Sequence, residues 1–159
     1  MVDPLDGTKE FIKRNGEFTV NIALIHNGAP ILGVVAVPVT GEVFFARQGH
    51  GAFVRRDGKD EALPKRRVWD INQPGLRVVA SRSHMNDETR EFIESLRDPQ
   101  LVSKGSSLKF MLLAESKADV YPRYAPTMEW DTAAAHAIVN ETGLKVLQHG
   151  SDQELQYNK

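Results

Sequence analysis

The chain has 159 residues and contains no cysteine, which excludes a disulfide framework, a thiol nucleophile and thiolate metal sites. Its 20 Lys and Arg residues nearly balance its 21 Asp and Glu residues, which argues against a protein that grips a nucleic acid polymer through a basic surface. We expect no transmembrane segment and no secretory signal. A cytoplasmic protein is therefore expected, and peripheral contact with the inner face of the cell membrane is left open.

The first residues of the chain hold its most informative pattern, the run DPLDGT. The proline and the glycine predict a tight turn, which can direct Asp3, Asp6 and the Leu5 carbonyl toward one point. Such an all-oxygen environment suits Mg²⁺. The amides of Gly7 and Thr8 could hold phosphate oxygens, and the Thr8 hydroxyl could orient a water. The same residues also make an ordinary β-turn with no function.

The following part, up to about residue 60, is predicted to be mainly β-structure. Glycine-containing turns separate four expected strands, at residues 18–25, 31–39, 43–46 and 51–55. This pattern predicts an antiparallel meander. The run 31–39 is almost continuously apolar, so we expect that strand to be covered on both faces. Residues 55–75 are charged and contain Gly and Pro, which indicates a surface connection.

The second half alternates between predicted strands and helices. Strands are expected at 76–80, 101–102, 119–121 and 145–148, and helices at 86–96, 106–115 and 132–141. Asn86 or Asp87 is expected to cap the first of these helices. The alternation predicts an α/β protein built as a layered α+β sandwich. We expect two subdomains: residues 1–60 with the motif turn and the mainly antiparallel sheet, and residues 61–159 with an α/β arrangement.

Further polar segments could also carry chemistry. Asp131 precedes an alanine-rich stretch, where it can cap a helix and also direct one oxygen at a metal. Ser106 and Lys109, near the start of a predicted helix, could bind a phosphate, although simple N-capping explains the same pattern. His84 lies in a polar loop after a predicted strand, a common place for ligands in α/β sheets. Arg123 could face an anion. An ordinary polar loop and a solvated arginine are the alternatives for the last two.

The DPLDGT run and the later Trp130-Asp131 pair together resemble the two-part signature of the inositol monophosphatase superfamily. Four further blocks resemble its bisphosphate nucleotidase branch, whose members remove the 3′-phosphate of adenosine 3′,5′-bisphosphate to give AMP. These blocks are KEFI at 9–12, SRSH at 81–84, GSSLKF at 105–110 and PTMEWD at 126–131. The resemblance extends over essentially the whole chain and implies the fold of that superfamily and a Mg²⁺-dependent phosphatase.

The resemblance also implies roles for individual residues. Asp3, the Leu5 carbonyl, Asp6 and Asp131 would be the Mg²⁺ ligands. Asp6 and Thr8 would be catalytic, with Thr8 helping to activate a water that attacks the phosphate in line. The partner would be a small nucleotide bisphosphate. The substrate-binding residues would be Leu5, Asp6, Gly7, Thr8, His84, Ser106, Lys109, Arg123 and Asp131.

Family members carry further structure before this motif, including a metal-binding glutamate and an aspartate that partners the motif threonine. We therefore expect the chain to correspond to the C-terminal portion of such an enzyme, with an incomplete first subdomain. Apolar surface on the strands between residues 18 and 55, weaker metal affinity and a lower rate are expected. The alternatives are an inactive or binding-only fragment, a phosphatase of another inositol or sugar phosphate, and a haloacid-dehalogenase phosphatase. The last class has one residue between its two acids, where this chain has two.

Overall fold

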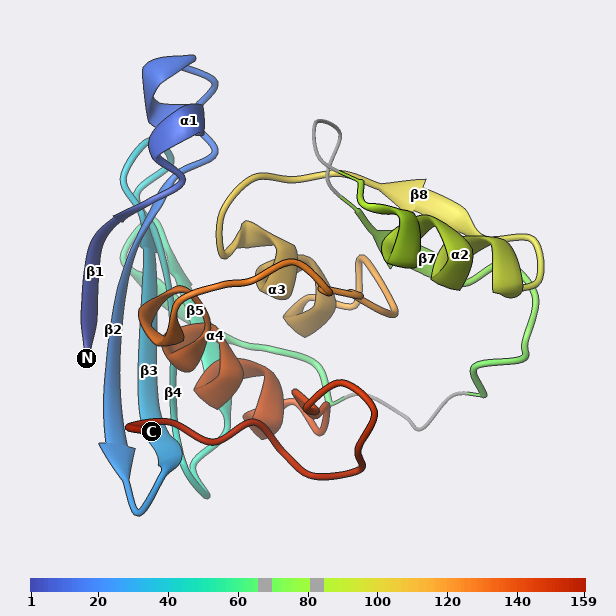
Figure 1. The fold of residues 1–159 in the computed structure, drawn as a ribbon. Helices are drawn as coiled ribbons and strands as arrows, with labels where there is room; N and C mark the ends of the chain where they lie inside the picture. Colours follow the sequence, from blue (N-terminus) through green and yellow to red (C-terminus); the bar gives the residue numbers. More distant parts are fainter. Residues whose placement is uncertain (66–69, 81–84) are drawn as a thin grey trace.

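The computed structural model describes residues 1–65, 70–80 and 85–159 (Figure 1). Its strands are β1 (Val2–Asp6), β2 (Thr19–His26), β3 (Ala29–Val37), β4 (Glu42–Arg47), β5 (Ala52–Arg56), β6 (Lys59–Ala62), β7 (Arg77–Val79) and β8 (Gln100–Val102). Its helices are α1 (Thr8–Ile12), α2 (Asp87–Ser95), α3 (Leu108–Ala114) and α4 (Glu129–Glu141). Among the described residues, no helix combines the length and the apolar character needed to cross a membrane.

The first half of the chain forms a six-stranded sheet in the order β1-β2-β3-β4-β5-β6, with every neighbouring pair antiparallel. The predicted meander is confirmed. The turn between β2 and β3 has positive φ at both Asn27 and Gly28, 49° and 76°, as a type I′ hairpin requires. The prediction of a surface connection over 55–75 is wrong for β6, because a second turn with positive φ, at Asp57 and Gly58, folds this charged segment back onto β5.

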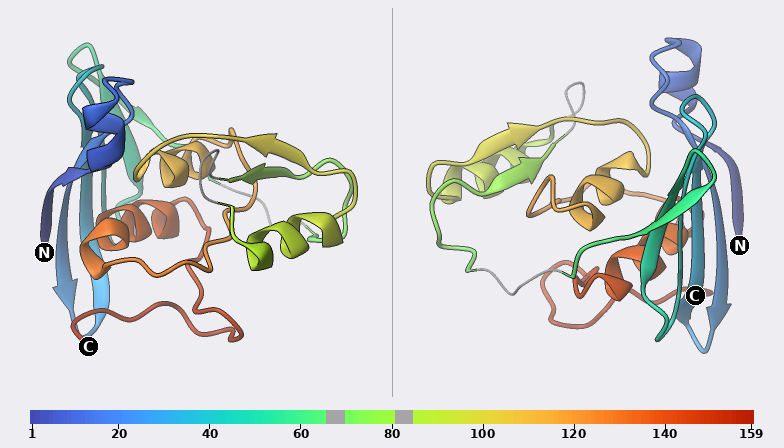
Figure 2. Two further views of the ribbon diagram at one scale, coloured as in Figure 1. Left: turned by 45° about the horizontal axis from the view of Figure 1, so that its top comes forward. Right: turned by 180° about the vertical axis from the view of Figure 1, so that it is seen from behind.

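Helix α4 packs across β2, β3 and β4 on one face of this sheet (Figures 1 and 2). Its alanine-rich face is buried, and together with Val35, Phe44 and Ile138 it forms the centre of the core. The helix lies so close to β3 that a Cβ added at Gly33 would fall 2.1 Å from the backbone oxygen of Ala134. The small residues on both elements therefore set the distance between the two layers.

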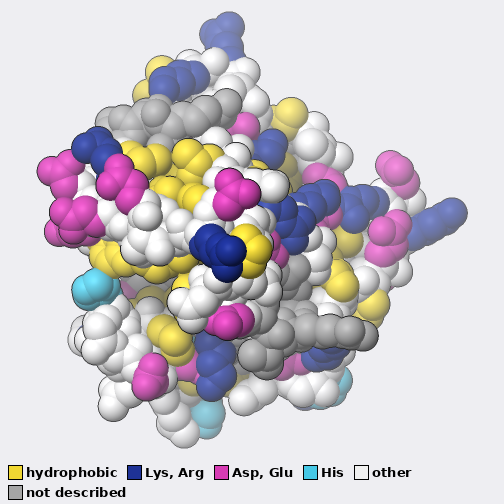
Figure 3. All heavy atoms as spheres, turned by 90° about the vertical axis from the view of Figure 1, so that its right-hand side faces the viewer, with side chains coloured by type: hydrophobic (Ala, Val, Ile, Leu, Met, Phe, Trp, Pro, Cys, Tyr) yellow, Lys and Arg dark blue, Asp and Glu magenta, His cyan; other side chains and the backbone are white. Residues whose placement is uncertain are grey.

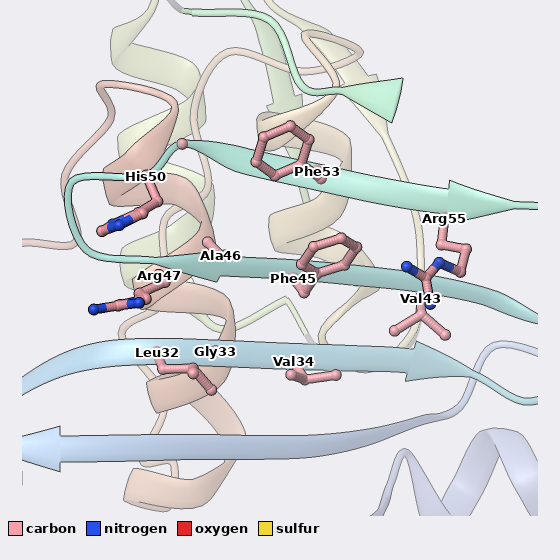
Figure 4. Close-up of a pocket in the computed structure, with 11 residues that line it drawn as sticks. Leu32, Gly33, Val34, Val43, Phe45, Ala46, Arg47, His50, Phe53 and Arg55 are labelled. Carbon is pink, nitrogen blue, oxygen red and sulfur yellow. The ribbon is translucent and has the colours of Figure 1, made fainter. Parts of the chain in front are cut away.

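No described helix covers the opposite face of the same sheet (Figure 2), and its side chains are mainly apolar. A row of paired residues crosses five strands: Val2, Ile22, Val34, Phe45 and Phe53. A hollow of about 390 Å³ lies along this face, with Arg47 and Arg55 also lining it (Figure 4). Ile22 is 44% exposed, so the expected exposure of apolar residues is confirmed. The prediction that the strand at 31–39 is covered on both faces is wrong, because α4 lies on one face alone.

The second half adds a parallel pair, β7 and β8, and helix α2. Ile93 of α2 packs on Val78 and Ala80, and Asn86 caps the helix by accepting a 3.1 Å hydrogen bond from the Thr89 amide. Figure 3 shows this side of the molecule, where acidic and basic side chains are interspersed.

The predicted layered α/β class is confirmed, whereas the subdomain boundary near residue 60 stays a prediction. Two predicted strands, at 119–121 and 145–148, are wrong. Each reduces to one isolated bridge, Val78 with Val120 and Leu147 with Glu154, because these segments run along their neighbours too briefly to form a ladder.

Candidate active site

Three aspartates from opposite ends of the chain meet beside the large sheet. Asp3 and Asp6 belong to β1, and Asp131 lies in the first turn of α4. One carboxylate oxygen from each lies within 4.8 Å of the other two. The packing of α4 on the sheet brings these groups together, so the sheet and the helix jointly define the site.

The DPLDGT run forms the end of a strand rather than a free turn. The pairing of β1 with β2 is irregular between Asp3 and Asp6, and the Leu5 amide donates a 3.0 Å hydrogen bond to Asp3 Oδ1. Gly7 follows with a φ of +91°, a left-handed conformation that favours glycine. Thr8 then begins helix α1 with its side chain exposed. The bulge and the glycine together direct both aspartates of the run to one side of the strand end.

Asp6 is held by one of its two oxygens. Its Oδ2 accepts hydrogen bonds from the Ser107 amide at 2.6 Å and the Ser107 hydroxyl at 2.7 Å, and longer ones from Thr19 Oγ1 at 3.3 Å and Asn21 Nδ2 at 3.4 Å. Thr19, Asn21 and Ser107 are all buried. Oδ1 is thus left without a partner among the described residues. This is the arrangement expected of a ligand whose geometry is fixed by its neighbours.

Sequence reasoning missed Thr19, Asn21 and Ser107. A signal for the first two is present, because they occupy the inward-facing positions of β2, where alternation calls for apolar residues. Two buried polar residues on the core face of a strand need partners. Here Asn21 Nδ2 donates to Ser107 Oγ at 2.8 Å and Thr19 Oγ1 donates to Asn21 Oδ1 at 3.0 Å, beside their longer contacts with Asp6.

Asp131 is fixed in a similar way. Helix α4 begins at Glu129, so Asp131 is its third residue and not the residue that precedes it, as the sequence had suggested. The helix starts earlier because the Asp131 carboxylate reaches back, accepting from the Met128 amide at 3.1 Å and from Thr127 Oγ1 at 2.8 Å. Both bonds use Oδ2. The Ser107 hydroxyl also lies 3.0 Å from the Asp131 carbonyl oxygen, which links this helix to α3 and to Asp6.

The electrostatics of the cluster fit a bound cation. Burial raises the pKa of Asp3 above its ordinary value, and the nearby charges of Asp6 and Asp131 raise it further, while the hydrogen bond from Leu5 opposes these effects. Three carboxylates in contact repel one another unless a positive charge lies between them. A donor set of three carboxylates suits a hard divalent cation.

Asp3→Asn is expected to stabilise the metal-free protein at pH 8 by about 1 kcal/mol, a few °C in Tm. Because the pKa of Asp3 is raised in the folded state, the folded protein favours the protonated carboxyl. The stability of the wild type therefore falls as pH rises through the raised pKa of Asp3. The advantage of the variant should therefore vanish in acid. Thermal unfolding of both proteins at pH 8 and in acid, with and without Mn²⁺, measures this. A variant that is less stable than the wild type at pH 8 without metal would contradict the repulsion.

Two basic residues stand beside the carboxylates. A small hollow of about 50 Å³ is lined by residues that include Asp6, Ser106, Lys109, Arg123 and Asp131. Lys109 Nζ lies 5.9 Å from the centre of the Tyr121 ring, and Arg123 donates to the Tyr121 hydroxyl at 3.3 Å. The structure thus places five of the sequence-predicted residues around one hollow, with positive groups next to negative ones. This arrangement can hold a phosphate and a cation together.

The remaining predicted residues lie nearby or outside the described part. Gly7 touches the α3 loop, since a Cβ there would lie 3.0 Å from Ser106 Cβ, and Glu17 accepts a 2.8 Å hydrogen bond from the Gly105 amide. The segment that carries Thr8 is therefore tied to the segment that carries Ser106. His84 belongs to residues 81–84, which lie outside the described residues.

Residues 1–157 match the inositol monophosphatase family. The chain belongs to this family. The resemblance carried by the DPLDGT run and the Trp130-Asp131 pair is confirmed, and the haloacid-dehalogenase alternative is wrong.

The chain is 50% identical to the 3′(2′),5′-bisphosphate nucleotidase CysQ of Salmonella typhimurium over 146 residues, which are 92% of this chain and 57% of that protein. It thus spans little more than half the length of this curated relative.

Two solved structures share the fold. The crystal structure of CysQ from Bacteroides thetaiotaomicron matches with a TM-score of 0.89 and 48% identity, covering 99% of this chain and 64% of that one. Mycobacterium tuberculosis SuhB matches with a TM-score of 0.77 at 24% identity, covering 92% and 60%. The inositol monophosphatase fold predicted from the sequence is confirmed.

Proposed function

We propose that this chain carries the metal-binding and phosphate-binding groups of a Mg²⁺-dependent phosphatase that converts adenosine 3′,5′-bisphosphate to AMP. The observation that supports this most directly is the meeting of Asp3, Asp6 and Asp131 beside Lys109 and Arg123. The choice of a nucleotide bisphosphate rests on the relatives named as 3′(2′),5′-bisphosphate nucleotidases. A cytoplasmic location stays a prediction.

The way the carboxylates are held supports the choice of Mg²⁺. Asp3 uses Oδ1 to accept from Leu5, and Asp6 and Asp131 each use Oδ2 for protein donors. Each carboxylate therefore offers one oxygen to a cation. Mg²⁺ takes single oxygens and keeps several waters, whereas Ca²⁺ often takes both oxygens of a carboxylate. The Leu5 carbonyl, between the two aspartates of β1, is proposed as a further ligand.

The chain's own groups have distinct proposed roles around the phosphate. A divalent cation bound here would neutralise charge on the phosphate and lower the pKa of the attacking water. Thr8 would orient that water, and the Gly7 amide would bind a phosphate oxygen. Lys109 and Arg123, already positioned by Tyr121, would hold the second phosphate of the nucleotide.

The test is phosphate release from adenosine 3′,5′-bisphosphate over a range of Mg²⁺ concentrations, with Salmonella CysQ assayed in parallel. Inositol 1-phosphate and fructose 1,6-bisphosphate serve as competing substrates. We expect Mg²⁺-dependent release that is fastest with the nucleotide. Faster release from either competitor would point to another substrate of the family. If this chain bound Mg²⁺ but released no phosphate while CysQ did, a binding-only role would replace the proposal.

A further inference from the structure

The last residues of the chain return to the helix turn that carries Asp131. The Asn158 amide donates to Glu129 Oε2 at 2.8 Å, and the Lys159 amide donates to Glu129 Oε1 at 3.3 Å. Glu129 is the first residue of α4. The tail is also tied to the β2–β3 hairpin, since the Tyr157 amide donates to the Gly28 carbonyl at 2.9 Å. The start of the helix is thus fastened to the sheet through the tail.

Tyr157 adds a side-chain contact from the tail to the same turn. Its side chain is 3% exposed, and its hydroxyl donates a 3.2 Å hydrogen bond to Thr132 Oγ1. His136 Nδ1 lies 2.9 Å from the same hydroxyl oxygen. Burial raises the pKa of Tyr157 and lowers that of His136, so both are neutral at pH 7.

Thr132 follows Asp131 directly, in a part of the helix that has few bonds of its own. The first amides of a helix have no partner one turn back, so the first turn frays unless other groups hold it. Here the Asp131 carboxylate is held by Thr127 and Met128 on the loop side. On the α3 side, the Asp131 carbonyl oxygen lies 3.0 Å from the Ser107 hydroxyl. The bond from Tyr157 to Thr132 restrains the turn from its remaining, buried side.

We propose that Tyr157 is a positioning residue for the metal site, and that its hydroxyl holds the first turn of α4 so that the Asp131 carboxylate faces Asp3 and Asp6. This inference rests on the proposed role of Asp131 as a metal ligand. Tyr157→Phe keeps the aromatic ring and removes the hydroxyl. The core would stay packed, and the first turn of α4 would be less restrained. The result would be a folded protein with a weaker site.

The experiment is a Mn²⁺ titration of the Tyr157→Phe variant. Binding is monitored by calorimetry and by the paramagnetic resonance signal of free Mn²⁺. Every titration is made at a temperature where circular dichroism shows the protein to be folded. We expect the Kd to rise about threefold to tenfold, less than the 10–100-fold typical of a group bonded directly to a ligand. Tyr124→Phe is the matched control, because the Tyr124 hydroxyl has no hydrogen-bond partner among the described residues, and its Kd should not change.

A second pair of variants separates positioning from packing. Thr132→Ser keeps the acceptor and should bind Mn²⁺ as the wild type does, whereas Thr132→Val should match Tyr157→Phe. The double variant Tyr157→Phe/Thr132→Val should bind no more weakly than either single variant, because both remove the same bond.

Two results would overturn the proposal. If Tyr157→Phe lowered the free energy of unfolding but left the Kd unchanged, the tyrosine would be structural alone. If the wild type bound no Mn²⁺, the proposed function would fail as well.

Discussion

Asp6→Asn is expected to weaken divalent-cation binding and to lower phosphate release by about 100-fold or more each. An asparagine cannot both accept the hydrogen bonds that the protein donates here and provide an oxygen ligand to the cation. Oδ2 of Asp6 accepts hydrogen bonds from Ser107, Thr19 and Asn21, and one Asp6 oxygen belongs to the carboxylate cluster. We expect Oδ1 to be the oxygen that binds the cation. The asparagine NH₂ group must point either toward those donors, which need an acceptor, or toward the cation, which would be repelled by the NH₂ group. Either orientation removes a ligand or leaves buried donors unmet.

Calorimetric titration with Mn²⁺ and the phosphate-release assay measure these two effects. Asp152→Asn is the matched control, because Asp152 is exposed and the substitution makes the same change in charge. The free energy of unfolding of both variants should be measured too, so that loss of binding is compared between folded proteins. A Kd for Asp6→Asn within threefold of the wild type would show that Asp6 is not a ligand.

Gly33→Ala is expected to destabilise the fold by at least about 3 kcal/mol. The added Cβ would lie 2.1 Å from the Ala134 backbone oxygen and 2.9 Å from both the Ala134 carbonyl carbon and Ala137 Cβ. Backbone atoms of a helix cannot rotate away as a side chain does, so α4 would have to move off the sheet. That movement would open space around Val35 and Ile138 and would displace Asp131 from the other two aspartates.

Urea unfolding followed by circular dichroism measures the loss of stability, and Mn²⁺ titration measures the loss of the site. Gly49→Ala is the control, because a Cβ at that exposed glycine meets no atom within 4 Å and its φ of +76° alone is unfavourable. We expect that control to lose about 1 kcal/mol and to keep its Mn²⁺ affinity. Equal losses in the two variants would show that the helix and the sheet can separate easily.

The sheet was predictable where local signals agreed with tertiary structure. Apolar, β-rich runs separated by glycine-containing turns predicted β2 and the three strands that follow it. The turn at Asn27 and Gly28 forms the first of these hairpins. Strand β6 has no apolar pattern and exists because the Asp57-Gly58 turn returns the chain to β5. Helix α4 begins three residues earlier than predicted for a similar reason, because the Met128 amide donates a hydrogen bond to the Asp131 carboxylate.

The candidate site was predictable to the extent that it lies in short motifs. Asp3 and Asp6 are close in sequence, and Asp131 was added from its position before a helix. Thr19, Asn21 and Ser107 were not predicted because they act through contacts between β2 and the start of α3, far apart along the chain. The structure brings Asp3, Asp6 and Asp131 together, but their roles stay predictions. The same holds for the roles assigned to Leu5, Gly7, Thr8, His84, Ser106, Lys109 and Arg123.

The bare face of the large sheet has a consequence for how copies of this chain can aggregate. Both outer edges of the sheet are blunted: β1 contains Pro4, which has no amide to donate, and β6 consists of four exposed residues, three of them charged. Edge-to-edge growth into extended fibrils is therefore disfavoured. The row from Val2 to Phe53 is flanked by Arg47 and Arg55 but contains no charged residue itself. We therefore expect two copies of this chain to associate through the uncovered faces of their sheets. Salting-out agents such as sulfate should strengthen this association.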